Sequence, residues 1–184
     1  MKRVGTVPCY DGLFEYDEYV AVQTSANARK LHHVWVTTEE VAMISAHLRS
    51  IGITAPTFAL CHGTRGGVEQ RLFQDAFPTC QILGTEIAET AAQFPCTIQW
   101  DFHDVKPEWV AACDFVYSNA LDHAFNPEVA MAAWVSCLKP SGVCVIEFVK
   151  SNRPDDSPDP PSHLDCCSMH DLRRRISLWG LRAV

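Results

Sequence analysis

The sequence predicts an α/β fold with three layers, in which helices cover both faces of a mostly parallel β-sheet. From Thr57 onward, short apolar runs alternate with amphipathic segments. Strands and helices that alternate at this spacing form parallel strands joined by right-handed crossovers. The last apolar run, residues 143–149, has Glu147 as its one charged residue. This is the pattern of a strand that helices bury on both faces.

Two helices are expected ahead of the sheet, within a helical lead-in that spans residues 1–53. The first has mixed character and runs from Glu15 to His33. The second begins at a capping box, in which the Thr37 hydroxyl and the Glu40 carboxylate each satisfy a free backbone N–H. Its apolar residues recur at helical intervals, and a glycine follows them as a stop signal: Val41, Ile44, Leu48, Ile51 and Gly52.

Five strands and two helices are expected in the central region, residues 54–150. Asn126 and Pro127 mark the start of the second of these helices, because asparagine caps a free N–H and proline suits the first helical position. The strands are predicted at residues 57–61, 80–84, 97–100, 114–118 and 143–149, and the helices at residues 68–77 and 126–138.

The remaining residues, 151–184, begin with a proline-rich segment at 151–162, which we interpret as a loop or lid. A last helix is expected from Ser168 to Trp179, and residues 181–184 would begin a sixth strand. A chain of 184 residues has about the length of a single domain with one hydrophobic core. We therefore expect a single domain over residues 1–184.

Composition excludes several classes of protein. The 15 Lys and Arg residues against 22 Asp and Glu residues give a net charge of −7, so we expect no nucleic-acid partner. No apolar stretch approaches the ~18 residues of a membrane span, and residues 1–20 lack the apolar segment of a signal peptide. We therefore expect a cytoplasmic protein without a membrane partner.

The nine cysteines include no C-x-x-C pair, and we expect no metal site.

Polar and glycine-rich segments follow the first three strands of the predicted sheet. Ligands of open parallel sheets bind at the carboxyl ends of the strands, where the strand order reverses. The first exit, residues 62–67, is glycine-rich, which allows a tight turn and close approach of the backbone to a ligand. Glu86 follows Gly63 by 23 residues, a spacing suited to an acid that accepts from ribose hydroxyls. Asp101 and Phe102 offer an acceptor and an aromatic face to adenine. This layout suits either a dinucleotide or S-adenosylmethionine.

The second half of the chain separates these two ligands. A predicted strand at residues 114–118 continues to residue 119 and is followed by a helix, which leads to Leu138-Lys139-Pro140-Ser141-Gly142 ahead of an apolar strand. These segments resemble the fourth-strand and post-helix motifs of class I S-adenosylmethionine-dependent methyltransferases. The turn at residues 138–142 is among the more specific local patterns of that family. The resemblance covers about residues 57–149 and is strongest to a poorly characterised bacterial subgroup.

The resemblance implies a Rossmann-like fold and S-adenosylmethionine as the cofactor. The family's sheet ends with a seventh, antiparallel strand, for which this chain has no residues. Either the sequence is truncated, a partner supplies that strand, or the proline-rich loop covers the fifth strand, and the unfinished edge would suit a homodimer. By this resemblance, the glycine-rich loop surrounds the methionine and ribose portion of the cofactor, and Glu86 binds the ribose. Residues 101–102 contact adenine, and residues 118–119 border the sulfonium. The expected cofactor-binding residues are His62, Gly63, Thr64, Arg65, Gly66, Glu86, Ile87, Asp101, Phe102, Ser118 and Asn119.

We expect methylation of a small-molecule acceptor, and O-methylation in particular. A hydroxyl acceptor benefits from a base, and Asp122 and His123 lie just beyond the fourth strand, where a carboxylate-paired histidine can take a proton near neutral pH. These two are the expected catalytic residues. The alternatives are another reaction of S-adenosylmethionine on the same fold, a binding protein without catalysis, and a nicotinamide-dependent reductase. The reductase would require a G-x-G-x-x-G spacing that Gly63, Gly66 and Gly67 do not give.

Overall fold

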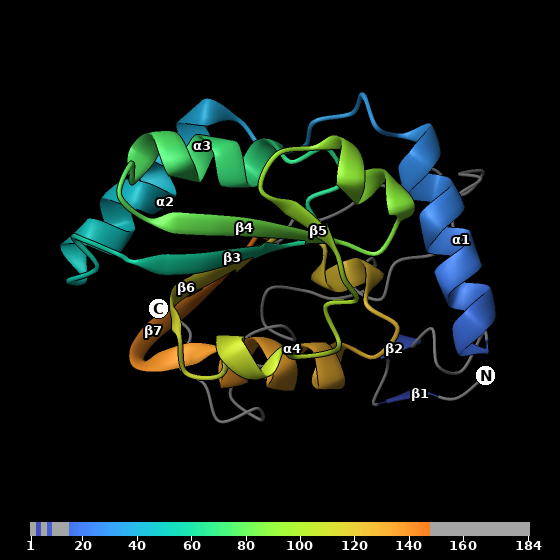
Figure 1. The fold of residues 1–184 in the computed structure, drawn as a ribbon. Coiled ribbons are helices and arrows are strands. Elements are labelled where there is room, and N and C mark those ends of the chain that lie inside the picture. The colour runs from blue at the N-terminus through green and yellow to red at the C-terminus, as the bar shows by residue number, and fades with distance from the viewer. Residues whose placement is uncertain (1–2, 5–6, 9–14, 148–184) are drawn as a thin grey trace.

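The computed structural model describes residues 3–4, 7–8 and 15–147. Its centre is a sheet of five parallel strands in the order β5-β4-β3-β6-β7 (Figure 1). The chain builds outward from β3 in one direction and then in the other, so the strand order reverses between β3 and β6. The strands are β3 (Phe58–His62), β4 (Gln81–Glu86), β5 (Thr97–Gln99), β6 (Cys113–Ser118) and β7 (Leu138–Ile146).

Four α-helices and three short 3-10 helices accompany this sheet in the described residues. The predicted capping box is confirmed, since Thr37 accepts from the Glu40 N–H and Glu40 accepts from the Thr37 N–H. The Asn126 cap ahead of Pro127 is confirmed too. The helices are α1 (Tyr16–Arg29), α2 (Thr38–Ser50), α3 (Val68–Ala76), α4 (Pro127–Ser136), η2 (Glu89–Gln93), η3 (Pro107–Trp109) and η4 (Leu121–His123).

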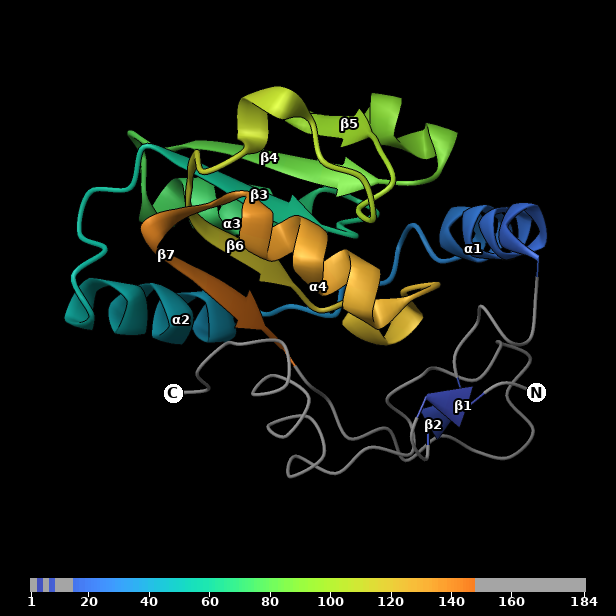
Figure 2. The ribbon, with the colours of Figure 1, turned by 90° about the horizontal axis from the view of Figure 1, so that it is seen from below.

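The predicted three-layer arrangement is confirmed. Helices α2 and α3 pack on one face of the sheet and α4 packs on the other, as the two views show (Figures 1 and 2). Side chains alternate along each strand, so neighbouring residues enter different cores. Leu60 belongs to the core under α4, whereas Cys61 belongs to the core under α2 and α3.

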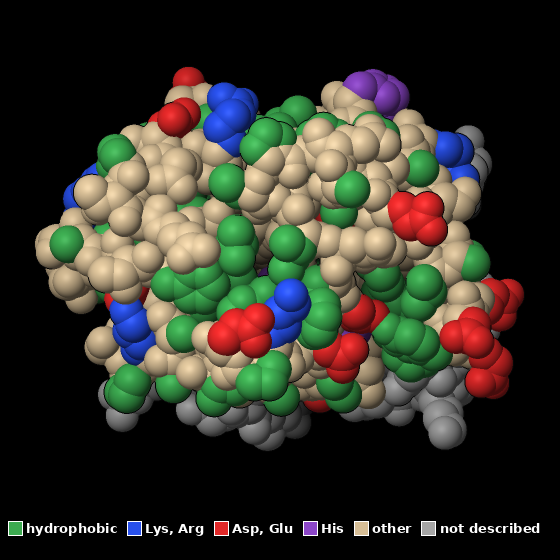
Figure 3. Space-filling view, viewed as in Figure 1, with side chains coloured by type: hydrophobic (Ala, Val, Ile, Leu, Met, Phe, Trp, Pro, Cys, Tyr) green, Lys and Arg blue, Asp and Glu red, His purple; other side chains and the backbone are tan. Residues whose placement is uncertain are grey.

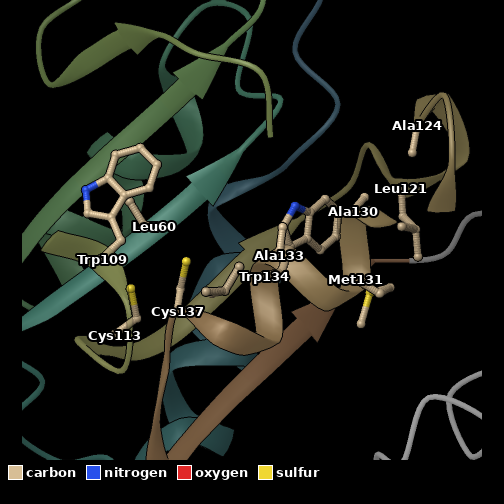
Figure 4. Packing of buried hydrophobic residues seen from close by; sticks show 11 residues of the cluster. Leu60, Trp109, Cys113, Leu121, Ala124, Ala130, Met131, Ala133, Trp134 and Cys137 are labelled. Atoms are coloured by element: carbon tan, nitrogen blue, oxygen red, sulfur yellow. The ribbon is translucent and has the colours of Figure 1, made fainter. Parts of the chain in front are cut away.

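The core under α4 is built around large side chains that have no contact with solvent (Figure 4). Trp134 of α4 is fully buried, and its indole N–H donates to the backbone oxygen of Phe102 at 3.0 Å. This bond fixes the segment that follows β5 against α4. The labelled members of the cluster are Leu60, Trp109, Cys113, Leu121, Ala124, Ala130, Met131, Ala133, Trp134 and Cys137.

Strand β7 begins earlier than the predicted strand, at Leu138 instead of residue 143. Leu138 pairs with Cys113 and Val143 pairs with Phe115, so the four residues 139–142 bulge out opposite the one residue between these partners. The expected turn is therefore present, but as an irregularity inside the strand. Helix α4 correspondingly ends at Ser136, two residues before the predicted end.

An ion pair holds this bulge to the start of β3. The Lys139 ammonium donates to Asp114 at 2.8 Å and to the Thr57 hydroxyl at 2.9 Å. Burial works against ionisation of Asp114, but the bonds from Lys139 and from the backbone N–H groups of Thr57 and Phe58 hold its pKa below the ordinary value. Pro140 and Gly142 of the bulge thus follow a residue that an ion pair holds in place.

Helix α1 stands apart from both layers and lies beyond the carboxyl ends of the strands (Figures 1 and 2). A short antiparallel pair, β1 (Arg3–Val4) and β2 (Val7–Pro8), precedes it and was not predicted. The predicted loop at 151–162, the helix at 168–179 and the sixth strand lie outside the described residues. Among the described residues, none of the helices combines the length and the apolar character that crossing a bilayer requires.

Candidate functional site

The exits of the strands converge on one cleft beneath α1. Its empty space, including open solvent at the mouth, is about 440 Å³. Each of the first three strand exits contributes two residues, the segment after β6 contributes two more, and α1 contributes three. The lining residues are Gly63, Arg65, Glu86, Ile87, Asp101, Phe102, Ala120, His123, Tyr19, Gln23 and Asn27. Seven of the residues that the sequence predicted for the site therefore lie in this one cleft.

Gly63 forms the floor of the cleft at the switch point between β3 and β6. Its φ of +72° lies in the left-handed region, which favours glycine. A Cβ placed on it would lie 2.5 Å from the Cβ of Ala120 and 3.6 Å from the Phe102 ring. The position therefore has no room for a side chain. The Gly63 N–H donates to the Thr85 oxygen at 2.9 Å, which ties the loop to β4.

The carboxylate of Glu86 is the most buried charge-bearing group in the cleft, with 1% of the residue exposed. Its Oε1 accepts from the Asn27 amide at 2.7 Å and from the Ala88 N–H at 2.9 Å, and its Oε2 accepts from the Arg65 N–H at 3.0 Å. A carboxylate has about four acceptor positions. One position, on Oε2, is therefore left for a ligand hydroxyl.

Arg65 reaches its bond to Glu86 through an uncommon backbone conformation. Its φ of +43° lies in the left-handed region, which is costly for a residue that carries a Cβ. The conformation turns the Arg65 N–H toward Glu86 and leaves the arginine side chain in the wall of the cleft.

Asp101 lies in the cleft with both carboxylate oxygens engaged. Oδ1 accepts from the backbone N–H of His103 at 2.9 Å and contacts the His103 Nδ1 at 2.6 Å. Oδ2 accepts from the hydroxyl of Tyr16 in α1. The neighbouring Phe102 ring contributes an apolar surface to the same wall.

His123, one of the two expected catalytic residues, lies in the cleft, whereas Asp122 lies beside it. The His123 Nε2 is 3.6 Å from the Asp122 Oδ2. The other ring nitrogen, Nδ1, is buried and has no hydrogen-bond partner among the described residues. The Tyr19 hydroxyl donates to the backbone oxygen of His123 at 2.9 Å and fixes the turn that carries it.

Five predicted cofactor residues do not line the cleft. His62 points into the core under α4, where its ring stacks on Trp134 at a centroid distance of 5.2 Å. Burial and, to a smaller extent, His103 lower the pKa of His62 to about 3, so the ring is neutral. Strand β3 extends through residue 62, and the alternation of side chains directs this residue to the same face as Leu60. The others are Thr64, Gly66, Ser118 and Asn119.

Ser118 and Asn119 do not line the cleft, but their side chains form hydrogen bonds with segments next to it. The Ser118 hydroxyl donates to the His62 oxygen and accepts from the Ala120 N–H, each at 3.0 Å, which holds the turn after β6. The Asn119 amide donates to Glu69 of α3 at 3.4 Å. Burial raises the pKa of Glu69 to about 7, the Asn119 bond and the charge of Arg65 opposing the rise.

The residues of the cleft that the sequence did not predict come mainly from α1. Tyr19, Gln23 and Asn27 follow one another at intervals of four and therefore share one face of the helix. This polar stripe was visible in the sequence, but nothing in the sequence indicates that the face covers the strand exits. Ala120 is the fourth, and its small side chain allows the close approach of Gly63.

Acidic side chains gather on the α1 side of the molecule, at the right of Figure 3, where the first turn of the helix carries Asp17 and Glu18. The exposed surface beside the cleft therefore favours a cationic or neutral ligand over a phosphate backbone.

No protein-family model matches this chain, and no curated protein matches its sequence. Solved structures do match it. The 1,6-didemethyltoxoflavin-N1-methyltransferase of Burkholderia thailandensis, solved with 1,6-didemethyltoxoflavin and S-adenosylhomocysteine, superposes with a TM-score of 0.70 at 17% identity. The match covers 93% of this chain and 81% of that chain.

Two sugar-modifying enzymes match over shorter regions. An amino pentose methyltransferase from Micromonospora echinaspora, with S-adenosylmethionine bound, has a TM-score of 0.53 at 22% identity, covering 72% of this chain and 58% of that one. A sugar N-methyltransferase from Streptoalloteichus has a TM-score of 0.54 at 18% identity, covering 83% and 59%. This chain thus spans less than two thirds of their length. Together these likenesses show that the chain has the fold of the class I S-adenosylmethionine-dependent methyltransferases.

Proposed function

We propose that the chain binds S-adenosylmethionine in the cleft and transfers its methyl group to a small-molecule acceptor. The observation that carries this proposal is the convergence of Gly63, Glu86 and Phe102 on one cleft at the switch point of the sheet. Three strand exits that are separate in sequence there offer a bare backbone, a buried carboxylate and an aromatic surface. Similar folds bind this cofactor or its demethylated product.

The residues of the cleft fit an adenosyl group. Glu86 has an acceptor position left for a ribose hydroxyl, and the bond from Asn27 can exchange for a second one. Ile87 and Phe102 provide apolar surfaces for a flat base. Gly63 lines the cleft and lets Ala120 pack against its backbone, where a side chain could not fit. We assign Gly63 and Arg65, the two residues of the glycine-rich loop that line the cleft, to the methionine end.

S-adenosylmethionine, when bound, supplies a methyl group on a sulfonium, which is already a good leaving group. The protein therefore contributes mainly alignment and the exclusion of water. We propose an acceptor hydroxyl whose proton passes to the Nδ1 of His123, a residue that lines the cleft and whose buried Nδ1 has no hydrogen-bond partner among the described residues. The new bond from oxygen to the methyl carbon forms as the bond from carbon to sulfur breaks. Asp122, near the opposite ring nitrogen, would stabilise the protonated imidazole.

The first test is calorimetry of the chain with S-adenosylmethionine and with S-adenosylhomocysteine. We expect both to bind with one site per chain and Glu86→Gln to weaken the binding, because an amide nitrogen would face the ribose. Glu89→Gln, on the exposed side of η2, is the matched control and should bind normally. A folded chain that binds neither compound would contradict the proposal.

The second test identifies the reaction. The chain is incubated with S-adenosylmethionine and candidate alcohols, phenols and amines, and the products are analysed by mass. A gain of one methyl group in the acceptor, together with S-adenosylhomocysteine, supports methyl transfer, and the methylated atom separates O- from N-methylation. Release of methylthioadenosine or of an aminobutyrate fragment would instead show a different reaction of the same cofactor.

A further inference from the structure

Gln23 of α1 carries a buried polar group that the fold leaves unsatisfied. Only 6% of the residue is exposed, and it belongs to the wall of the cleft. Its carboxamide nitrogen has no hydrogen-bond partner among the described residues. Buried polar groups in folded proteins nearly always have a partner, and leaving one unpaired costs about 1–3 kcal/mol. A buried donor without a partner at a cleft wall is therefore a candidate contact for a ligand.

The neighbours of Gln23 on the same face of α1 are already engaged. Tyr19, one turn earlier, donates to the His123 backbone oxygen, and Asn27, one turn later, donates to Glu86. Four helical residues advance about 6 Å along the axis. Gln23 thus lies in the wall of the cleft between these two contacts, one helical turn from the residue that bonds the carboxylate proposed for the ribose.

The surfaces around this position suit the faces of a base but leave its polar edge without a partner. Ile87 and Phe102, which follow β4 and β5, are apolar. An ionised Asp101 can accept hydrogen bonds but cannot donate them, and contacts from His103 and Tyr16 take three of its roughly four acceptor positions. The ring nitrogens of adenine accept hydrogen bonds, so they require a donor that this carboxylate does not supply.

We propose that the carboxamide of Gln23 reads the edge of adenine, donating to N7 and accepting from the N6 amino group. A carboxamide carries a donor and an acceptor side by side, and this bidentate arrangement is how glutamine and asparagine recognise adenine elsewhere. The inference rests on the proposed function, and it makes α1 a wall of the binding site that selects the base.

The test is calorimetry with three ligands: S-adenosylhomocysteine, its 7-deaza analogue and its inosine analogue, in which oxygen replaces the N6 amino group. Gln23→Leu is compared with the wild-type chain and with Gln81→Leu, an exposed glutamine at the opposite end of β4. We expect Gln23→Leu to bind S-adenosylhomocysteine about 10- to 100-fold more weakly, and Gln81→Leu to bind like the wild type.

The analogues identify the cause of the loss. In the wild-type chain both should bind more weakly than S-adenosylhomocysteine, and Gln23→Leu should weaken each analogue by a smaller factor than it weakens S-adenosylhomocysteine, because each analogue has already lost one of the two bonds. If Gln23→Leu binds S-adenosylhomocysteine like the wild type, or weakens all three ligands equally, the inference is wrong while the proposed function stands. If the wild-type chain binds none of the ligands, the proposed function itself fails.

Discussion

The Asn27 amide of α1 donates to the Oε1 of Glu86, 59 residues later in the chain, at 2.7 Å. The bond joins the helix that covers the cleft to a carboxylate at the end of a central strand. Tyr16 makes a similar bond to Asp101 from the first turn of the same helix. Two further bonds attach this part of the chain to the strand exits: the Tyr19 hydroxyl donates to the His123 oxygen, and the Arg65 guanidinium donates to the oxygen of Lys30, just past the end of α1.

Asn27→Ala should therefore loosen α1 without unfolding the sheet. Hydrogen bonds to charged groups contribute about 1.5–3 kcal/mol, and Glu86 keeps its two backbone donors, so we expect a loss of about 1–2 kcal/mol in the free energy of unfolding. Urea denaturation measures it. Hydrogen exchange should locate the change, with faster exchange in α1 and unchanged protection in β3 and β4. Ala28→Gly, at an exposed position of the same helix, controls for helix propensity, and equal exchange in the two variants would contradict the assignment.

Gly63→Ala should destabilise the chain more than Gly52→Ala. Both glycines have positive φ, at +72° and +101°, so both substitutions strain the backbone. The added Cβ at residue 52 meets nothing within 4 Å, whereas at residue 63 it would lie 2.5 Å from Ala120. We expect an additional cost of about 1–3 kcal/mol for Gly63→Ala, measured by urea denaturation.

Replacing Ala120 by glycine tests the cause of that difference. The double variant Gly63→Ala with Ala120→Gly removes the clash but keeps the positive φ, so it should recover part of the lost stability. Comparison with Ala120→Gly alone gives the coupling between the two positions. Purely additive effects would show that the contact at residue 120 is not the cause.

The strands were predictable because each is a buried apolar run between turn residues, and this signal is local. The contacts of α1 are not local. Tyr16 and Asn27 bond to residues 85 and 59 positions away, and no periodicity within the helix specifies those partners. The sequence therefore predicted the helix but not its place over the strand exits, and it predicted the strand ends of the site but missed Gln23.

His62 illustrates a second limit of the sequence. The residue adjoins Gly63 and was assigned to the loop, but hydrogen bonding to β4 and β6 extends β3 by one residue. A strand directs successive side chains to opposite faces, and this single added position places the ring in the core against Trp134. One residue at a strand boundary thus decides between a cleft residue and a core residue.

Glu69→Gln should change how stability depends on pH. Burial raises the folded-state pKa of Glu69 from 4.5 to about 7, so the native chain binds more protons than the unfolded chain between these values. The free energy of unfolding contributed by this residue is therefore highest below pH 4.5 and falls as pH rises to about 7. The glutamine variant lacks this loss. It should match the wild type at pH 4.5 and exceed it above pH 7, by at most about 3 kcal/mol.

Urea denaturation at several pH values measures this difference. Glu89→Gln, at an exposed position, should run parallel to the wild type at every pH. A constant difference between Glu69→Gln and the wild type across the range would mean that Glu69 does not titrate as its burial implies.

His123→Gln should separate catalysis from cofactor binding. If the Nδ1 of His123 takes the proton of an acceptor hydroxyl, the variant should lose about 100-fold in kcat. S-adenosylhomocysteine should bind with an unchanged Kd, because the proposed role of the His123 ring is toward the acceptor and not toward the cofactor. The measurement uses the acceptor found in the product assay, with calorimetry for the Kd. Asp122→Asn should lose less activity than His123→Gln, because the carboxylate acts through the imidazole, whose Nε2 lies 3.6 Å from the Asp122 Oδ2. Full activity of His123→Gln would exclude histidine-assisted O-methylation. It would instead fit an amine acceptor, because an unprotonated amine can take the methyl group without a base.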